Sequence, residues 1–249
     1  MKIIACVSLV PDSTTKVKIS GTNKSIDDNG VSFILNPYDE FAVEEAIRLK
    51  EKNSGDVTAV TFGTDKAKEV LKKSFQMGAD KGILIKTENN DFDSYTVAKN
   101  LSDYIKTQNP DVILFGKQSI DFDGQLIPSM VSEMLNIPCI NVVVKLDIAD
   151  GKVTAEREVE GGKEIVESKL PVIIGAQKGL NEPRYPNLKS IMAAKSKPIE
   201  EIPATYSGNR VEIMEMHLPA EKASGKIFTN GREDVAELVR LLREEAKVI

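Results

Sequence analysis

Residues 56–86, DVTAVTFGTDKAKEVLKKSFQMGADKGILIK, contain the pattern that decides the fold. Residues 56–62 are rich in apolar and β-branched side chains, which predicts a buried strand. Residues 64–77 carry apolar side chains at helical spacing, and Gly78 ends the predicted helix. Residues 81–86 predict a second strand. A strand, a helix and a strand in this order predict a βαβ unit with parallel strands.

The same alternation continues on both sides of this unit. Upstream, residues 3–10 predict a buried first strand and residues 39–53 predict an amphipathic helix. Downstream, residues 93–108 predict a helix, residues 111–115 a strand and residues 127–135 another helix. Together these units predict a Rossmann-like α/β fold, a parallel sheet flanked by helices on both faces. In such sheets ligands bind beyond the carboxyl ends of the strands.

After Pro138 the pattern changes. Three stretches separated by glycine turns predict a small antiparallel section: residues 140–147, 153–159 and 163–169. Residues 171–176 predict a last buried strand. From about Gly179 onward only residues 232–246 have a helical pattern, and the rest predict no regular element. We therefore expect a nucleotide-binding-type α/β domain over residues 1–189. Residues 190–249 should form an extended C-terminal arm whose helix packs on another subunit.

Composition restricts the function. The chain has 249 residues and a net charge of −5, so we expect no nucleic-acid partner. Its apolar runs are too short to cross a bilayer, and we expect no membrane insertion. The two cysteines, Cys6 and Cys139, suit a reducing compartment, which predicts a cytoplasmic protein. With His217 as the single histidine, the chain offers no nucleophile–base pair and no metal-ligand set, so we expect no enzyme activity of its own.

Polar loops after the predicted strands form the candidate binding site. The candidates are Cys6 at the end of the first strand and the residues of three loops: Asn36, Pro37, Tyr38 and Asp39; Phe62 and Gly63; and Lys117, Gln118, Ser119, Asp121, Asp123, Gly124 and Gln125. Asp39 has two interpretations. Either it caps free amides at the start of its helix, or it belongs to a site where that helix end holds an anion or a ribose. The chain has no glycine-rich dinucleotide motif, P-loop or nucleophile elbow to decide between them.

Five stretches resemble one protein family in the same order. They are NPYDEFAVEEAIRLKE (residues 36–51), FQMGADKGILI (75–85), GKQSIDFDG (116–124), AEREVEGG (155–162) and LPVIIGAQKGLNEPRYPNLKSIMAAKSKP (170–198). The family is the electron transfer flavoprotein β-subunit, and the resemblance covers nearly the whole chain. It implies a domain similar to the adenine nucleotide α-hydrolases, with AMP as a structural ligand. It also implies an obligate heterodimer with an α-subunit that holds most of the FAD site. Such a pair carries electrons from dehydrogenases, typically the acyl-CoA dehydrogenases of fatty acid oxidation, to a membrane quinone oxidoreductase.

The resemblance also implies residue roles. The strand-end candidates from Cys6 to Gln125 would form the nucleotide pocket. The loop of residues 180–189, which is stiff because Arg184 and Tyr185 lie between two prolines, would dock on the dehydrogenase. Its recognition residues would be Leu180, Asn181, Glu182, Pro183, Arg184, Tyr185 and Leu188. Within it, Leu188 would be the apolar anchor. Glu158 matches a glutamate that interacts with the mobile flavin domain of the α-subunit.

The chain departs from the family at two places. Leu126, Ile127 and Pro128 stand where the family commonly has Gln–Thr–Gly or Gln–Val–Gly, and Pro128 lacks an amide donor. Ser13 stands where some members have a tyrosine near the α-subunit flavin. Without the glycine, a monophosphate fits more easily than a dinucleotide, so we expect AMP before FAD.

Three alternatives remain open from the sequence. The chain could be an FAD-binding β-subunit of an electron-bifurcating complex. It could be a nucleotide-binding regulatory module similar to universal stress proteins, which would leave the 180–189 loop unexplained. The nucleotide pocket could also be empty.

Overall fold

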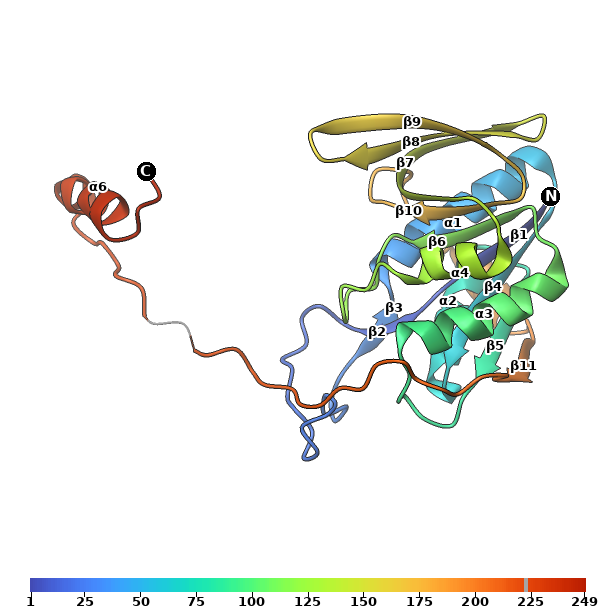
Figure 1. Cartoon of the computed structure of the whole chain (residues 1–249), viewed down its shortest axis with the longest axis horizontal. Coiled ribbons are helices and arrows are strands. Elements are labelled where there is room, and N and C mark those ends of the chain that lie inside the picture. The colour runs from blue at the N-terminus through green and yellow to red at the C-terminus, as the bar shows by residue number, and fades with distance from the viewer. Residues whose placement is uncertain (222–223) are drawn as a thin grey trace.

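Within residues 1–221 and 224–249, which the computed structural model describes, one sheet of nine strands forms the centre of the molecule (Figure 1). Seven strands are parallel, and the last two continue the sheet in antiparallel pairs. The predicted α/β class, with a parallel sheet and a small antiparallel section, is confirmed. In spatial order the strands are β11 (Ile199–Pro203), β5 (Lys81–Lys86), β4 (Asp56–Gly63), β1 (Lys2–Cys6), β6 (Val112–Gly116), β10 (Val172–Ala176), β7 (Cys139–Ala149), β8 (Lys152–Val159) and β9 (Gly162–Lys169).

The strands in the middle of the sheet are apolar because both faces of the sheet are covered. Every residue of β6 and β10 is buried. Along β1, Ile3 and Ala5 belong to one hydrophobic cluster, whereas Ile4 and Cys6 belong to another. Since successive side chains of a strand point to opposite faces, one core lies on each side of the sheet.

Helices cover both faces (Figure 1). The first cluster receives side chains from α1 (Pro37–Asn53), α2 (Lys68–Met77) and α5 (Leu188–Ala194), and the second from α3 (Ser94–Gln108) and α4 (Ile127–Leu135). A short 3₁₀ helix, η1 (Asp65–Ala67), precedes α2, where we predicted one continuous helix. Packing of α2 on β5 is close, because a Cβ on Gly82 would lie 2.6 Å from the Phe75 ring.

The first predicted strand is wrong in its extent. β1 ends at Cys6, and residues of the predicted strand beyond it form β2 (Leu9–Pro11), which pairs antiparallel with β3 (Phe33–Leu35) in a separate sheet. The break falls at Ser8. Its amide donates to the Asp39 carboxylate, and its carbonyl accepts from the Asn36 amide. These bonds take Ser8 out of the main sheet.

The prediction that no regular element lies between Gly179 and residue 232 is also wrong. Both α5 and β11 form there, and β11 extends the main sheet by pairing parallel to β5. Ile199 packs against the first cluster and Ile202 against the second, so this short strand joins both cores. The division of the chain at residue 189 remains a prediction, although β11 belongs to the main sheet.

The arm after β11 first follows α3. Asn100 on this helix is buried, and its Oδ1 accepts hydrogen bonds from the amides of Thr205 and Tyr206. Its Nδ2 donates to the Tyr206 carbonyl. Further along, Asp93 accepts a hydrogen bond from the Val211 amide. Side chains of α3 and of its N-cap residue therefore hold the start of the arm through its backbone.

The arm ends in η2 (Gly231–Asp234) and α6 (Val235–Glu244), which Figure 1 shows apart from the sheet. The predicted helix over residues 232–246 is thus confirmed in a shorter form. No residue of α6 is buried. Among the helices that the structure describes, none has the length and apolar character needed to cross a membrane.

Candidate functional site

The predicted strand-end site lies where the sheet reverses its order. The chain builds from β1 outward to β4 and β5, and it then returns to the other side of β1 with β6 and β10. In a doubly wound sheet, a crevice opens at the carboxyl ends of the two strands that flank this reversal. Here those strands are β1 and β6.

Asp39, in the first turn of α1, joins the ends of these two strands. Its Oδ2 accepts hydrogen bonds from the Ser8 amide at 2.8 Å and from the Ser8 hydroxyl at 2.7 Å. Its Oδ1 accepts from the Gly116 amide at 3.0 Å. The residue is only 5% exposed. Oδ2 therefore binds the segment that follows β1, and Oδ1 binds the end of β6. Neither interpretation of the sequence anticipated this role. We refer to Asp39, Ser8 and Gly116 as the switch-point clamp.

The clamp leaves no room for a side chain at position 116. A Cβ on Gly116 would lie 2.4 Å from Asp39 Oδ1 and 2.7 Å from Tyr38 Cβ. Gly124 in the following loop is different, since the nearest atom to its Cβ would be Ser119 Oγ at 3.5 Å, an ordinary contact. Glycine is thus required at position 116 by the close approach of α1.

Burial changes the acidity of two groups at this point. It raises the pKa of Asp39 from 3.8 to about 6, although hydrogen bonds from Ser8, Asn36 and Gly116 oppose the shift. Burial also raises the pKa of the Cys6 thiol well above its ordinary value, and the charge of Asp39 adds to the shift. Cys6 belongs to the hydrophobic cluster beneath α3 and α4, where it packs as a small apolar side chain.

Asn36 connects the start of α1 to the loop after β6. It is 1% exposed, and its Nδ2 donates to the Gln118 carbonyl at 2.9 Å. Its Oδ1 is buried without a hydrogen-bond partner among the residues that the structure describes. A buried polar atom without a partner is costly, so Asn36 Oδ1 is a candidate for a contact that the described residues do not supply.

The loop of residues 117–125 is closed by its own polar groups. Gln118 Nε2 donates to Asp123 at 2.6 Å, and Gln125 Nε2 donates to Gln118 Oε1 at 3.2 Å. The Ser119 amide donates to the Gly124 carbonyl at 3.0 Å. Asp121 accepts a hydrogen bond from the Phe122 amide.

Two further predicted residues link this loop and its neighbours. The Lys117 ammonium lies 5.1 Å from the centre of the Tyr38 ring, so that the loops after β6 and before α1 meet at a cation–π contact. Phe62 lies one strand away, at the end of β4, where its ring packs edge-on against Phe92 with centroids 4.9 Å apart. Gly63 follows it and accepts a hydrogen bond from the Thr87 amide. The structure thus brings the β1, α1 and β6 candidates together, with the β4 candidates beside them.

The predicted docking loop divides into inward and outward residues. Leu180 and Asn181 are buried, and Arg184 folds back on α1. By contrast, Tyr185 is 97% exposed and Leu188 is 76% exposed. Glu182 is exposed and Pro183 is half-buried. Glu158, on β8, is exposed and accepts a hydrogen bond from Gln177 at 3.1 Å.

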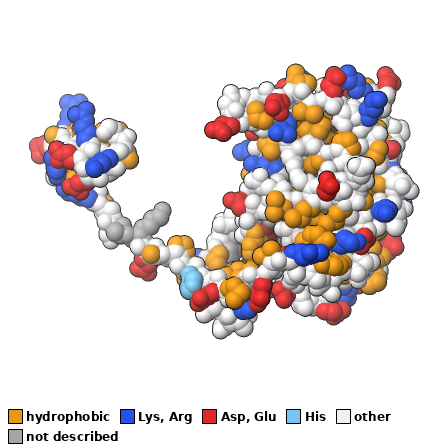
Figure 2. All heavy atoms as spheres, viewed as in Figure 1, with side chains coloured by type: hydrophobic (Ala, Val, Ile, Leu, Met, Phe, Trp, Pro, Cys, Tyr) orange, Lys and Arg blue, Asp and Glu red, His pale blue; other side chains and the backbone are white. Residues whose placement is uncertain are grey.

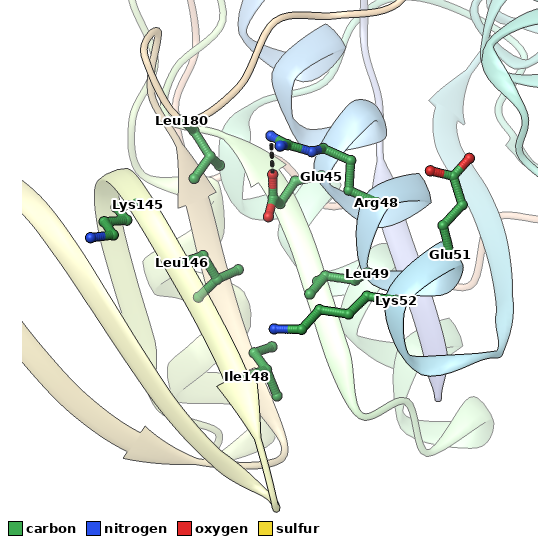
Figure 3. A pocket seen from close by; sticks show the side chains of 9 residues that line it. All are labelled: Glu45, Arg48, Leu49, Glu51, Lys52, Lys145, Leu146, Ile148 and Leu180. Carbon is green, nitrogen blue, oxygen red and sulfur yellow. Dashed lines mark ion pairs between the residues drawn. The ribbon is translucent and has the colours of Figure 1, made fainter.

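A cavity of about 500 Å³ lies behind this loop, between α1 and β7 (Figure 3). Sequence patterns gave no sign of it, because its walls come from segments far apart in the chain. The lining residues are Glu45, Arg48, Leu49, Glu51, Lys52, Lys145, Leu146, Ile148 and Leu180.

Sequence reasoning missed two members of the clamp, Ser8 and the backbone of Gly116. Ser8 is the one polar side chain between Cys6 and Pro11, which was the available signal. Ser8 lies inside the strand predicted for residues 3–10, so the sequence does not predict its bonds to Asp39.

This arrangement defines a Rossmann-like α/β protein with a candidate site at the ends of its strands. A family model described as "Electron transfer flavoprotein domain" matches residues 24–207. The chain is 42% identical to the electron transfer flavoprotein subunit beta of Bacillus subtilis, over 94% of this chain and 95% of that protein. It is 38% identical to the subunit of the same name from Syntrophomonas wolfei, over 100% of this chain and 98% of that protein. The mitochondrial subunit beta of Arabidopsis thaliana is 35% identical over the full length of both chains. The chain therefore belongs to the electron transfer flavoprotein β-subunit family.

The raised pKa of Asp39 predicts a pH-dependent stability. The folded state holds the Asp39 proton more tightly than the unfolded chain, so stability should fall as the pH rises from about 4 to about 6, by about 3 kcal/mol, and then level off. Asp39→Asn removes this titration. Urea unfolding at pH 4, 5, 6 and 7 should therefore give a wild-type-minus-variant difference that decreases with pH up to about 6. A difference that is constant with pH would contradict the assignment.

Proposed function

We propose that this chain is the β-subunit of a heterodimeric electron transfer flavoprotein. The pair accepts electrons from dehydrogenases, typically acyl-CoA dehydrogenases, and passes them to a quinone oxidoreductase. FAD, held mainly by the α-subunit, supplies the redox chemistry. The β-chain itself contributes a structural nucleotide site and surfaces for partners, without substrate chemistry of its own. Its two free cysteines support a reducing, cytoplasmic location.

The observation that carries the proposal is the exposed apolar face of the C-terminal helix α6. Val235, Leu238, Val239 and Leu242 recur at helical spacing along α6, yet no residue of this helix is buried. Ile227, just before it, is 85% exposed. Figure 2 shows this helix as a separate group of atoms at the end of the thin arm. An amphipathic helix of this kind gains most of its stability from packing its apolar face, so the arm supports an obligate partner, the α-subunit.

We assign AMP to the strand ends at the sheet reversal. The free Oδ1 of Asn36 suits a donor from the nucleotide, such as a ribose hydroxyl or the adenine amino group. Lys117 supplies a positive charge for the phosphate, and the Ser119 hydroxyl supplies a further polar group. These residues, with Tyr38 and Gln118 beside them, would hold the ligand.

The end of the loop after β6 favours a monophosphate over FAD in this chain. α4 begins at Ile127, and Pro128 stands in its first turn without an amide donor. Leu126, just before it, is exposed and apolar. A pyrophosphate would need close approach to backbone amides, which glycine usually provides. This chain has none at positions 126–128.

The 180–189 loop supports a docking role toward dehydrogenases. Tyr185 on the loop and Leu188, which the structure places at the first position of α5, are large exposed side chains. Such side chains commonly anchor protein interfaces. Glu158 lies on another exposed part of the surface, and we assign it to contacts with the mobile flavin domain of the α-subunit.

The nucleotide content of the heterodimer tests the proposal. The co-expressed and purified subunits should form one 1:1 species. Denaturation followed by chromatography should release one FAD and one AMP per heterodimer. Two FAD would contradict the AMP assignment and favour an electron-bifurcating subunit. FAD alone would mean that the crevice holds no nucleotide.

Substitution of Leu188 tests the docking role. Leu188→Ala should weaken docking by about 1.5–3 kcal/mol, or about ten- to a hundredfold in the docking constant. The visible flavin spectrum and the heterodimer should be unchanged, and the measurement is the rate of flavin reduction by an acyl-CoA dehydrogenase at increasing heterodimer concentration. Ile165→Ala is the control, because Ile165 on β9 is 74% exposed, much like Leu188. Equal kinetics for both variants would remove the docking role from Leu188.

A further inference from the structure

Residues 182–187 of the docking loop are held by polar contacts rather than by packing. None of these six described residues is buried. Behind them lies the cavity between α1 and β7, which Leu180 lines (Figure 3). A surface segment with few buried apolar contacts opens easily unless other bonds hold it.

Arg184 makes those bonds. Its Nε and Nη2 donate to the two carboxylate oxygens of Glu44 at 2.8 and 3.0 Å. Its Nη1 and Nη2 donate to Glu51 at 2.7 and 3.1 Å. Its backbone amide donates to Glu44 at 3.2 Å. One guanidinium therefore binds two carboxylates that lie about two helical turns apart on α1. Both contacts have the paired, directional geometry that arginine forms with carboxylates.

The Glu44 side chain is the inner member of this group. It is only 5% exposed, whereas that of Glu51 is 56% exposed. A buried carboxylate needs a charged partner, so Glu44 and Arg184 depend on each other. Asn181 adds a second hold nearby, since its Nδ2 donates to the Phe41 carbonyl at 3.0 Å and to Glu45 at 2.9 Å.

We infer that Arg184, through Glu44 and Glu51, is a positioning residue that fixes the docking loop on α1 and presents Tyr185 and Leu188 in one conformation to the dehydrogenase. The inference rests on the proposed docking role of the loop. The Arg184 guanidinium binds carboxylates of α1, so Arg184 affects docking by holding the loop in one conformation. A preordered loop loses less conformational entropy on binding, which strengthens the complex.

Glu44→Gln breaks the paired contact while preserving the size of the side chain. In the heterodimer, hydrogen exchange of the amides of residues 182–187 should become faster. The KM of an acyl-CoA dehydrogenase for the heterodimer should rise about tenfold, with kcat unchanged. Glu133→Gln is the matched control, because it removes one acidic charge from an exposed site on α4. It should alter neither quantity.

A double-mutant cycle separates positioning from direct contact. If Glu44 acts through the loop, Glu44→Gln should add less than about twofold to the KM when Leu188 is already alanine. Full additivity of the two substitutions would overturn the inference, as would faster exchange without any change in KM. An unchanged KM in Leu188→Ala alone would instead refute the docking role itself. The exchange measurement would still report whether Arg184 holds the loop.

Discussion

The Asp39 carboxylate is the interaction on which the functional part of this fold depends. Three chain segments meet at it: the segment between β1 and β2 through Ser8, the start of α1, and the end of β6 through Gly116. A single buried acidic group thus fixes the two strands that flank the sheet reversal. The cost of burying its charge appears as a pKa raised to about 6, and three hydrogen bonds reduce that cost without cancelling it.

Helix α1 links the two surfaces that we assign to ligand and partner. Its first turn carries Asp39 in the clamp, and its middle and end carry the Glu44 and Glu51 carboxylates that bind Arg184. The buried carboxylates among them, Asp39 and Glu44, would be destabilising without partners. Here each one ties a distant loop to the helix. A shift of α1 would therefore move both the strand ends at the sheet reversal and the 180–189 loop.

Local patterns predicted the elements that local physics determines. The strand of residues 81–86 and the helix of residues 127–135 match β5 and α4, because apolar spacing and end signals lie within each segment. The order of elements also sufficed for the α/β class and for the position of the crevice at strand ends. The candidate loops around Asn36 and Lys117 do meet there.

What the sequence could not give depends on long-range partners. Ser8 and Asp39 are 31 residues apart, Asp39 and Gly116 are 77 apart, and Glu44 and Arg184 are 140 apart. An acidic residue on a helix is normally assigned to the solvent face, so the burial of Glu44 had no local signal. Likewise, β11 is a strand only because β5 offers it an edge.

The most direct test of the clamp compares urea unfolding of Gly116→Ala with that of Gly124→Ala. The Gly116 variant should lose about 1–3 kcal/mol of unfolding free energy because its methyl group has no space, while the Gly124 variant stays near wild type. Equal stability of the two variants would contradict the central role of the Asp39 clamp.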